Sequence, residues 1–529
     1  MGGGVIVLVA LIPWIFAAGH DITLIRSDDS GLRMARIDGV DWKTPGKDEI
    51  LGEIRTSSAS AEIEVVVDAT KRMQKVHGFG ASITESTAIN LNSLPATKQD
   101  ELLRLLFSKE GAALSFLKMP MLCNDFCSNA SGWSTYDDNE NDDDDLLHFS
   151  IARDLEKDGT LTFLKRAIDY GFEGEIQSYM DYAPDWMLSN GSSTLAKEHY
   201  DTLANYYAKF VQAYAKHGIT ISYLSLFNEP VDSYMHMTNE DMATLLADHV
   251  GPLFDKLKLR PRTKLTYGGQ ATRAWAEMHV SAMMATRASA YIDHISYHGY
   301  DCQFNCSKAR QRYDAVQSLH QRWPDKELFM TEICYAYNDG DSDGNCSSLK
   351  TLPMCNEWPR DPTLAPPLPR LDFDDGQVWG SRIVSDVRAG ASGWLYWNLL
   401  LSAIGGPYLF SPSHNDGAKN FQQAPIHLSK DHLDFHTTGL FFHLAHFSRF
   451  SSKTTAIEIE IESNVDSIRD APEGTAGQDA SGFVNSTHAI LQLLNHDRTP
   501  RRAKILYSDY EAVIDLSPTS ITTAIWELK

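Results

Sequence analysis

The feature of this sequence that most constrains its fold is a regular alternation of short apolar segments with amphipathic ones. Segments rich in β-forming residues occur in order at 76–84, 113–119, 174–179, 221–227, 264–268, 291–298, 327–332 and 393–399. Between them, apolar residues recur at the three- and four-residue spacing of half-buried helices, at 98–107, 161–170, 197–216, 239–257, 273–286, 307–322 and 376–388. This order is typical of a (β/α)8 barrel, so we expect an α/β fold whose main unit is a TIM barrel.

The two ends of the chain follow a different pattern. Residues 435–450 are typical of one more helix, and alternating strand patterns follow at 455–461, 488–494, 503–507 and 521–526. Strand-like segments also precede the barrel, at 22–25 and 61–67. We therefore expect a β-sandwich domain built from both chain ends. The expected divisions are a leader at 1–19, N-terminal strands at 20–75, the barrel at 76–430, and the last helix with the C-terminal sandwich at 431–529.

The N-terminus has the character of a secretory signal. Residues 5–18 are almost entirely apolar and run into Ala17-Ala18-Gly19, small residues that suit a cleavage site. An uncleaved anchor is the alternative, although the run is shorter than the roughly 20 residues of a membrane span. Glycosylation sequons support a secreted or lysosome-like glycoprotein, and they begin at Asn129, Asn190, Asn305, Asn345 and Asn485.

Cysteine spacing is consistent with disulfide bonds. Six of the seven cysteines fall into pairs that are close in the sequence and could form disulfides. These are Cys123 with Cys127, Cys302 with Cys306, and Cys346 with Cys355. The odd total leaves a free thiol, for which Cys334 in an apolar strand end is the candidate.

Charge and motif content exclude several kinds of partner. The formal net charge of −23 opposes binding to nucleic acid. The acidic run 142–145 lacks the alternating ligand spacing of a calcium loop. Two histidine pairs, His294 with His298 and His432 with His436, lack the accompanying motifs of a zinc site. We expect no metal and no cofactor.

Two of the expected strands end in a carboxylic acid. The segment 221–227 leads into Asn228-Glu229-Pro230, and 327–332 ends in Thr331-Glu332. Active sites of such barrels lie at the C-terminal ends of the strands. Two carboxyl groups there suit hydrolysis of a glycosidic bond, which needs one acid and one nucleophile. A single glutamate at a strand end is more often an ion-pair residue, so further motifs are needed to decide.

Those motifs occur in a recognisable order. They are His77-Gly78-Phe79-Gly80-Ala81-Ser82-Ile83-Thr84, Phe227-Asn228-Glu229-Pro230, Thr331-Glu332 and Trp394-Leu395-Tyr396-Trp397-Asn398. In this respect the chain resembles glycoside hydrolase family 30, especially its glucosylceramidases, from about residue 73 to residue 450. The resemblance implies a retaining mechanism with Glu229 as general acid/base and Glu332 as nucleophile. It also implies that Asn228 binds the sugar 2-hydroxyl.

Five further residues are candidates for substrate binding. Asp125 matches a family position that holds sugar hydroxyls, although it could instead cap a turn. Trp397 follows the last barrel strand and is expected to form a wall of the sugar site, with Trp394 in the core. His298 and Tyr300 could orient the carboxylates, with structural packing as the rival interpretation. Asn420 matches a position that lines the mouth of the family's site, but a loop asparagine has many other uses.

Two departures from the family bear on the substrate. Asp181 and Gly299 stand where glucosylceramidases carry aromatic residues, so stacking would be replaced by hydrogen bonding or empty space. The first hypothesis is a glycosidase acting on glucosylceramide, with transient contact with a membrane surface. The second is a secreted β-1,6-glucanase or xylanase, and the third an inactive carbohydrate- or lipid-binding homologue. A glycolipid or a β-glucan is the expected substrate.

Overall fold

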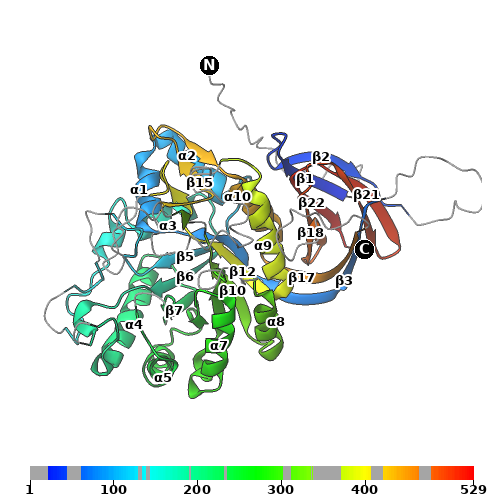
Figure 1. The fold of residues 1–529 in the computed structure, drawn as a ribbon. Coiled ribbons are helices and arrows are strands. Elements are labelled where there is room, and N and C mark those ends of the chain that lie inside the picture. The colour runs from blue at the N-terminus through cyan, green and yellow to red at the C-terminus, as the bar shows by residue number, and fades with distance from the viewer. Residues whose placement is uncertain are drawn as a thin grey trace, which may run out of the picture.

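The structure, a computed structural model, consists of a barrel and a curled β-sheet that lie side by side (Figure 1). It describes residues 22–43, 61–128, 134–138, 143–189, 192–230, 235–301, 311–334, 336–337, 371–406, 421–463 and 478–528. The leader, the expected Cys302–Cys306 and Cys346–Cys355 pairs and four of the five sequons lie outside these ranges. So do most residues of 350–375, a stretch that is rich in proline.

Eight parallel strands close into a barrel, which confirms the TIM-barrel prediction. In order around the barrel they are β4 (Gly78–Ser82), β5 (Phe116–Pro120), β6 (Glu175–Met180), β7 (Tyr223–Phe227), β8 (Lys264–Gly268), β9 (His294–His298), β10 (Glu327–Glu332) and β12 (Ala391–Tyr396). Phe116, Tyr223, Phe329 and Leu395 form one buried cluster of side chains from these strands. Gly80 allows β4 to approach β5 closely, because a Cβ there would lie 1.8 Å from the Phe116 carbonyl oxygen.

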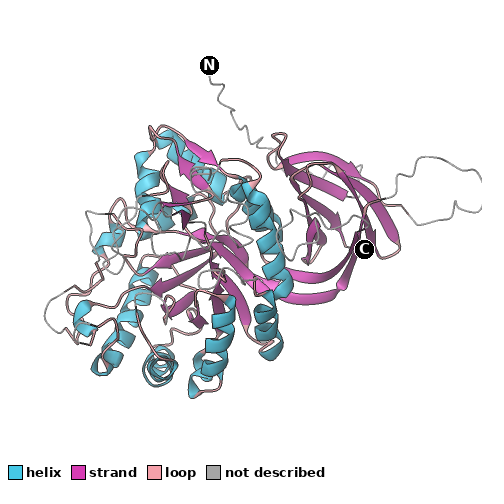
Figure 2. Cartoon of the chain, in the orientation of Figure 1, coloured by secondary structure: helices cyan, strands magenta, loops and turns pink. Residues whose placement is uncertain are grey.

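Helices surround the barrel (Figure 2). They are α1 (Glu85–Ser93), α2 (Ala96–Phe107), α3 (Thr160–Asp169), α4 (Tyr200–Lys216), α5 (Asn239–Thr244), α6 (Gly251–Lys256), α7 (Arg273–Met284), α8 (Tyr313–Arg322) and α9 (Asp375–Ala389). The segment predicted as one helix at 239–257 is α5, a π-helical turn over Leu245–Val250, and α6. Thr238 and Thr272 begin α5 and α7 by accepting hydrogen bonds from Asp241 N and Trp275 N. Short 3-10 turns cover Ala152–Leu155, Asp185–Met187, Lys197–His199 and Arg287–Tyr291.

Both chain ends build the second part, as predicted. Within the described residues its nine strands are β1 (Ile22–Asp28), β2 (Ala35–Val40), β3 (Ile63–Val76), β17 (Thr454–Ser463), β18 (Gln478–Val484), β19 (His488–Asn495), β20 (Arg501–Tyr507), β21 (Tyr510–Leu516) and β22 (Ser520–Glu527). They form one curled sheet in the order β2-β1-β22-β19-β18-β17-β3-β20-β21. β1 pairs with β22, and β3 pairs with β17 and β20, so the first and last strands of the chain are neighbours.

The helix predicted at 435–450 begins later than expected. Residues Phe435–Thr437 form strand β16, and α10 runs over Gly439–Ser451. The reason is Thr438, whose side chain accepts a hydrogen bond from Phe441 N and so sets the helix start. α10 joins the two parts of the molecule, since His446 Nε2 lies 3.0 Å from Ser27 Oγ in the sheet. The remaining short strands are β11 (Ala336–Tyr337), β13 (Leu400–Leu401), β14 (Phe421–Gln422) and β15 (Ile426–Leu428).

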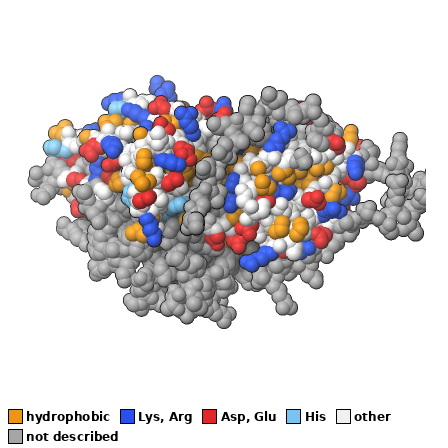
Figure 3. Space-filling model, turned by 90° about the horizontal axis from the view of Figure 1, so that it is seen from above, with side chains coloured by type: hydrophobic (Ala, Val, Ile, Leu, Met, Phe, Trp, Pro, Cys, Tyr) orange, Lys and Arg blue, Asp and Glu red, His pale blue; other side chains and the backbone are white. Residues whose placement is uncertain are grey.

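The face seen from above carries charged and hydrophobic side chains together (Figure 3). Seen from above, acidic and basic side chains are intermingled (Figure 3). Among the helices of the described ranges, none is long and apolar enough to cross a membrane. The one described sequon asparagine, Asn485, accepts a hydrogen bond from Thr487 N at 2.8 Å in a turn between β18 and β19.

Candidate active site

Glu229 and Glu332 meet at the C-terminal end of the barrel. Glu332 is the last residue of β10, and Glu229 lies two residues after β7. A carboxylate oxygen of each, together with a ring nitrogen of His298, lies within 4.8 Å of the others. The Glu229 and Glu332 side chains are only 13% and 10% exposed. Two carboxyl groups from distant parts of the sequence therefore share one largely buried site.

Lys118 is the main residue of this site that the sequence analysis missed. It lies in the middle of β5, is 1% exposed, and donates a 2.6 Å hydrogen bond from Nζ to Glu332 Oε2. The same ammonium group donates to Asn228 Oδ1 at 3.3 Å and lies 4.1 Å from the centroid of the Tyr179 ring. A buried charge needs a partner, so a lysine inside the apolar run Phe116-Leu117-Lys118-Met119-Pro120 was a usable signal.

The ammonium group also bears on metal binding. Glu229, His298 and Glu332 are close enough to hold a metal ion between them. However, Lys118 Nζ already places a positive charge 2.6 Å from Glu332 Oε2. A second cation on the same carboxylate would be repelled by the first. We therefore interpret the group as an acid–base constellation.

His298 is neutral and directs a proton toward Glu229. Its pKa is lowered to about 3, chiefly because burial disfavours the imidazolium, and Lys118 lowers it further against the opposing effect of Glu332. Its Nε2 lies 3.5 Å from Lys118 Nζ, which can only donate, so Nε2 is the accepting nitrogen. The ring proton is then on Nδ1, which donates to Glu229 Oε1 at 2.7 Å. The other oxygen of Glu229 is left to carry the acid proton.

The surroundings of Glu229 favour that protonated form. Burial raises its pKa to about 7, although the charge of Lys118 acts in the opposite direction. The residue also has a left-handed backbone, with φ of 43°, and its N–H donates to Gly269 O at 3.1 Å. Non-glycine residues with this conformation occur often at functional sites. Glu229 can thus retain a proton near neutral pH.

Tyr300 and Asn228 complete the contacts around the two acids. The Tyr300 hydroxyl donates to Glu332 Oε1 at 3.3 Å and also lies 3.4 Å from Cys334 Sγ. Burial raises the pKa of Tyr300, so its hydroxyl remains a donor. Because Asn228 Oδ1 accepts from Lys118, the amide NH2 is the part of Asn228 that is available to a substrate hydroxyl. Cys334 is buried and has a free thiol, as predicted.

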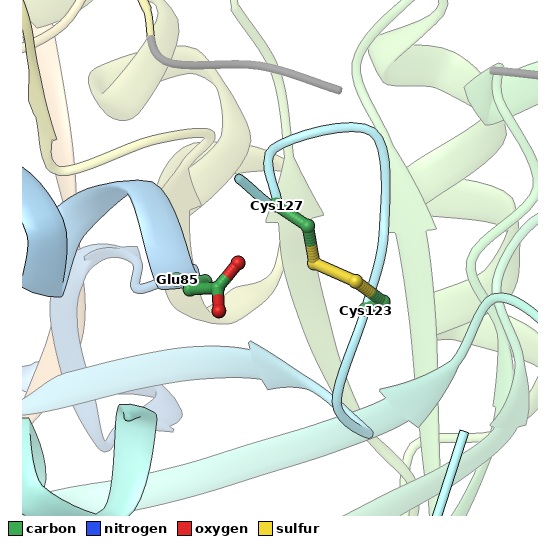
Figure 4. Close-up of side chains that lie close together, drawn as sticks. All are labelled: Glu85, Cys123 and Cys127. Carbon is green, nitrogen blue, oxygen red and sulfur yellow. A yellow bond between two sulfur atoms is a disulfide. The ribbon is translucent and has the colours of Figure 1, made fainter. Parts of the chain in front are cut away.

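Asp125 is presented by a disulfide-closed loop. Cys123 and Cys127 are bonded, as predicted, and enclose three residues with Asp125 in the middle. Figure 4 shows this disulfide beside Glu85, which accepts a 2.6 Å hydrogen bond from Ser128 N and so ties the end of the loop to α1.

Two tryptophans lie at the last barrel strand, Trp394 within β12 and Trp397 directly after it. Trp397 follows β12 and is 5% exposed, with its ring centroid 6.0 Å from that of Phe126 in the disulfide loop. Trp394 is fully buried, and its Nε1 donates to Asp386 Oδ2 at 3.1 Å. Trp394 is therefore a core residue, whereas the sugar-binding role of Trp397 stays a prediction.

The remaining predicted positions have different outcomes. Asn420 lies outside the described residues. At Gly299 the structure offers no empty space, because a Cβ would lie 2.6 Å from Ile333 Cδ1. Asp181 follows β6 directly and is buried beside the site, where Asp125, Glu332, Lys118 and Glu229 all act on its charge.

Comparison with known proteins places this geometry in a family. Residues 76–350 and 370–451 match the model of the glycosyl hydrolase family 30 TIM-barrel domain. A putative glucosylceramidase 3 of Caenorhabditis elegans is 27% identical over 88% of this chain and 83% of its own length. The lysosomal acid glucosylceramidase of Mus musculus is 25% identical over 76% of this chain and 72% of its own.

Similarity extends to enzymes with other substrates. An endo-1,6-beta-D-glucanase of Neurospora crassa is 24% identical over 57% of this chain and 63% of its own length. The solved structure of an endo-beta1,6-glucanase superimposes with a TM-score of 0.73 at 18% identity, covering 97% of this chain and all of that one. This structural likeness concerns the fold alone.

Proposed function

The chain belongs to glycosyl hydrolase family 30 and is a glycosidase, and we propose that it cleaves the β-glucosyl bond of glucosylceramide with retention of configuration. The observation that carries the retaining mechanism is the approach of Glu229 and Glu332, since one carboxylate oxygen of Glu229 lies within 4.8 Å of one of Glu332. Retaining enzymes hold their two carboxyl groups about 5–5.5 Å apart, whereas inverting enzymes leave about 6.5–9.5 Å for a water molecule.

In this mechanism each acid has one role. Glu332 attacks the anomeric carbon, while the proton on Glu229 passes to the departing glycosidic oxygen as its bond to that carbon breaks. Glu229, now ionised, removes a proton from water, and the water oxygen displaces Glu332 from the sugar. Lys118 and Tyr300 hold the two oxygens of Glu332, and His298 holds Glu229. The two proton transfers and the two displacements are thus carried by Glu229, Glu332 and water.

Glucosylceramide is favoured by the extent of similarity. The glucosylceramidase relative from Caenorhabditis elegans aligns with 88% of this chain, whereas the Neurospora crassa glucanase aligns with 57%. A lipid-linked substrate would require transient contact with a membrane surface. The secretory or lysosomal location proposed here is supported by the sequons and by the lysosomal relative.

We expect the protein to hydrolyse glucosylceramide in detergent micelles faster than a soluble β-1,6-glucan or a xylan at equal bond concentration. The measurement is released glucose or reducing sugar under identical conditions. Cleavage of the glucan alone would replace the lipid substrate with the polysaccharide and leave the mechanism standing. A folded protein that cleaves no glycoside would instead support the binding-protein hypothesis.

We expect kcat/KM on an aryl β-glucoside to fall as pH rises above about 7. Glu229 must be protonated to act as the acid, and its pKa of about 7 means that the protonated fraction declines about tenfold per pH unit above that value. The measurement is a kcat/KM profile from pH 4 to 9, with unfolding monitored at each pH. A profile that stays level from pH 6 to 9 would contradict this assignment.

A further inference from the structure

Asp181 is a buried carboxyl group whose role the proposed mechanism leaves open. It follows the last residue of β6, at the C-terminal end of the barrel, and is 3% exposed. Within the described ranges its carboxylate accepts no hydrogen bond, unlike those of Glu229 and Glu332. A buried polar group without a partner is costly, so such a group in a site is expected to have a partner in the bound state.

The surroundings of Asp181 place it at the reacting centre. Met180, the residue before it, accepts a 2.9 Å hydrogen bond at its carbonyl oxygen from Asn228 N, so Asp181 begins the loop beside Asn228 and Glu229. The charges of Asp125, Lys118 and both proposed catalytic acids act on its carboxyl group. Tyr179, two residues earlier on β6, has the Lys118 ammonium 4.1 Å above its ring. A sugar between Glu229 and Glu332 would thus lie within the same group of side chains as Asp181.

The chemistry of this group favours a neutral, hydrogen-bonding partner. Burial raises the pKa of Asp181 well above its usual range, and the neighbouring acids Asp125 and Glu332 raise it further. A protonated carboxyl group both donates and accepts hydrogen bonds, as a sugar hydroxyl also does. Lys118, whose charge acts on Asp181, is already bonded to Glu332.

We propose that Asp181 is a specificity-determining residue that binds one ring hydroxyl of the sugar held between Glu229 and Glu332. This inference rests on the proposed glycosidase function and deepens it. Recognition through a carboxyl group selects a hydroxyl at one ring position, whereas an apolar or aromatic wall would accept a sugar that lacks it.

The test is a cycle of variants and deoxy substrates. Wild type, Asp181→Asn and Asp181→Leu are assayed on 4-nitrophenyl β-glucoside and on its 2-, 3-, 4- and 6-deoxy analogues. Asp181→Leu is expected to lower kcat/KM on the intact glucoside about 10- to 100-fold. On one deoxy analogue the variant and wild type should differ by less than about twofold, because the bonded hydroxyl is already missing. Asp181→Asn should retain part of the discrimination.

Matched controls separate recognition from folding. Asp185 is exposed in the turn four residues later, so Asp185→Asn and Asp185→Leu should leave every rate unchanged. Thermal unfolding of each variant shows whether Asp181→Leu is folded. An equal loss on all five substrates would indicate a structural role and overturn the proposal, as would no loss on any of them.

A binding measurement keeps the proposal independent of turnover. In a Glu332→Gln background, calorimetry with the intact glucoside and its deoxy analogues should show the same pattern in Kd. If the wild-type protein cleaves no β-glucoside, the proposed function fails, and this titration still decides the role of Asp181. Equal Kd values for Glu332→Gln alone and for Glu332→Gln combined with Asp181→Leu would overturn the proposed role of Asp181.

Discussion

Glu332→Gln is expected to lower kcat/KM on an aryl β-glucoside by about 10⁴-fold or more, as loss of a nucleophile does in enzymes with covalent intermediates. An amide oxygen is too weak a nucleophile to displace the leaving group. The substitution preserves shape, since the amide oxygen can still accept from Lys118 Nζ, which donates to Glu332 Oε2 at 2.6 Å. The fold should therefore persist, and steady-state rates with an unfolding curve measure both properties.

Two further measurements make this assignment specific. Glu156→Gln, at an exposed position, provides the same chemical change away from the site and should leave the rate unchanged. A 2-deoxy-2-fluoro-glucoside with an activated leaving group should label the wild-type protein on the peptide that contains Glu332, because the fluorine slows hydrolysis of the glycosyl-enzyme. Activity of Glu332→Gln within tenfold of wild type, or labelling of another peptide, would remove Glu332 from this role.

The position of this acid illustrates what the sequence can predict. β10 has a glutamate at both ends, Glu327 and Glu332, and barrel geometry assigns chemistry to the C-terminal one. The structure places Glu327 at the opposite, N-terminal end of the strands, where its Oε2 lies 2.6 Å from His294 Nε2. The order of the strands and the spacing of apolar residues in the sequence are therefore enough to predict that Glu332 and Glu229 lie at the same end of the barrel.

Contacts within the site could not be predicted in the same way. A lysine inside the apolar run of β5 indicates a buried charge that needs a partner, but only the three-dimensional structure shows that its ammonium group reaches Glu332. The tautomer of His298 depends on two distances, to Lys118 and to Glu229, that no sequence pattern fixes. The late start of α10 depends on one side-chain cap at Thr438, which the apolar period of 435–450 does not reveal.

Glu229→Gln should show a loss that depends on the leaving group. With a poor leaving group, such as the alcohol of glucosylceramide, kcat/KM should fall about 10²- to 10⁴-fold, because general acid catalysis contributes about that much. With a dinitrophenyl glucoside, which needs no protonation, formation of the glycosyl-enzyme should continue and its hydrolysis should become slow. Added azide needs no base and should restore turnover, giving the β-glucosyl azide.

The same variant also tests the electrostatic argument. If the pKa of about 7 belongs to Glu229, the fall in kcat/KM above pH 7 should disappear in Glu229→Gln, and it should persist in Glu156→Gln. Azide replaces the water that Glu229 would activate. Restoration of turnover by azide and loss of the fall in kcat/KM above pH 7 should therefore occur in the same variant. A variant that keeps the fall in kcat/KM above pH 7 would show that another group supplies the proton. Formation of the α-azide would show that Glu332 is not the nucleophile, because a retaining mechanism requires two successive inversions at the anomeric carbon, one from each face.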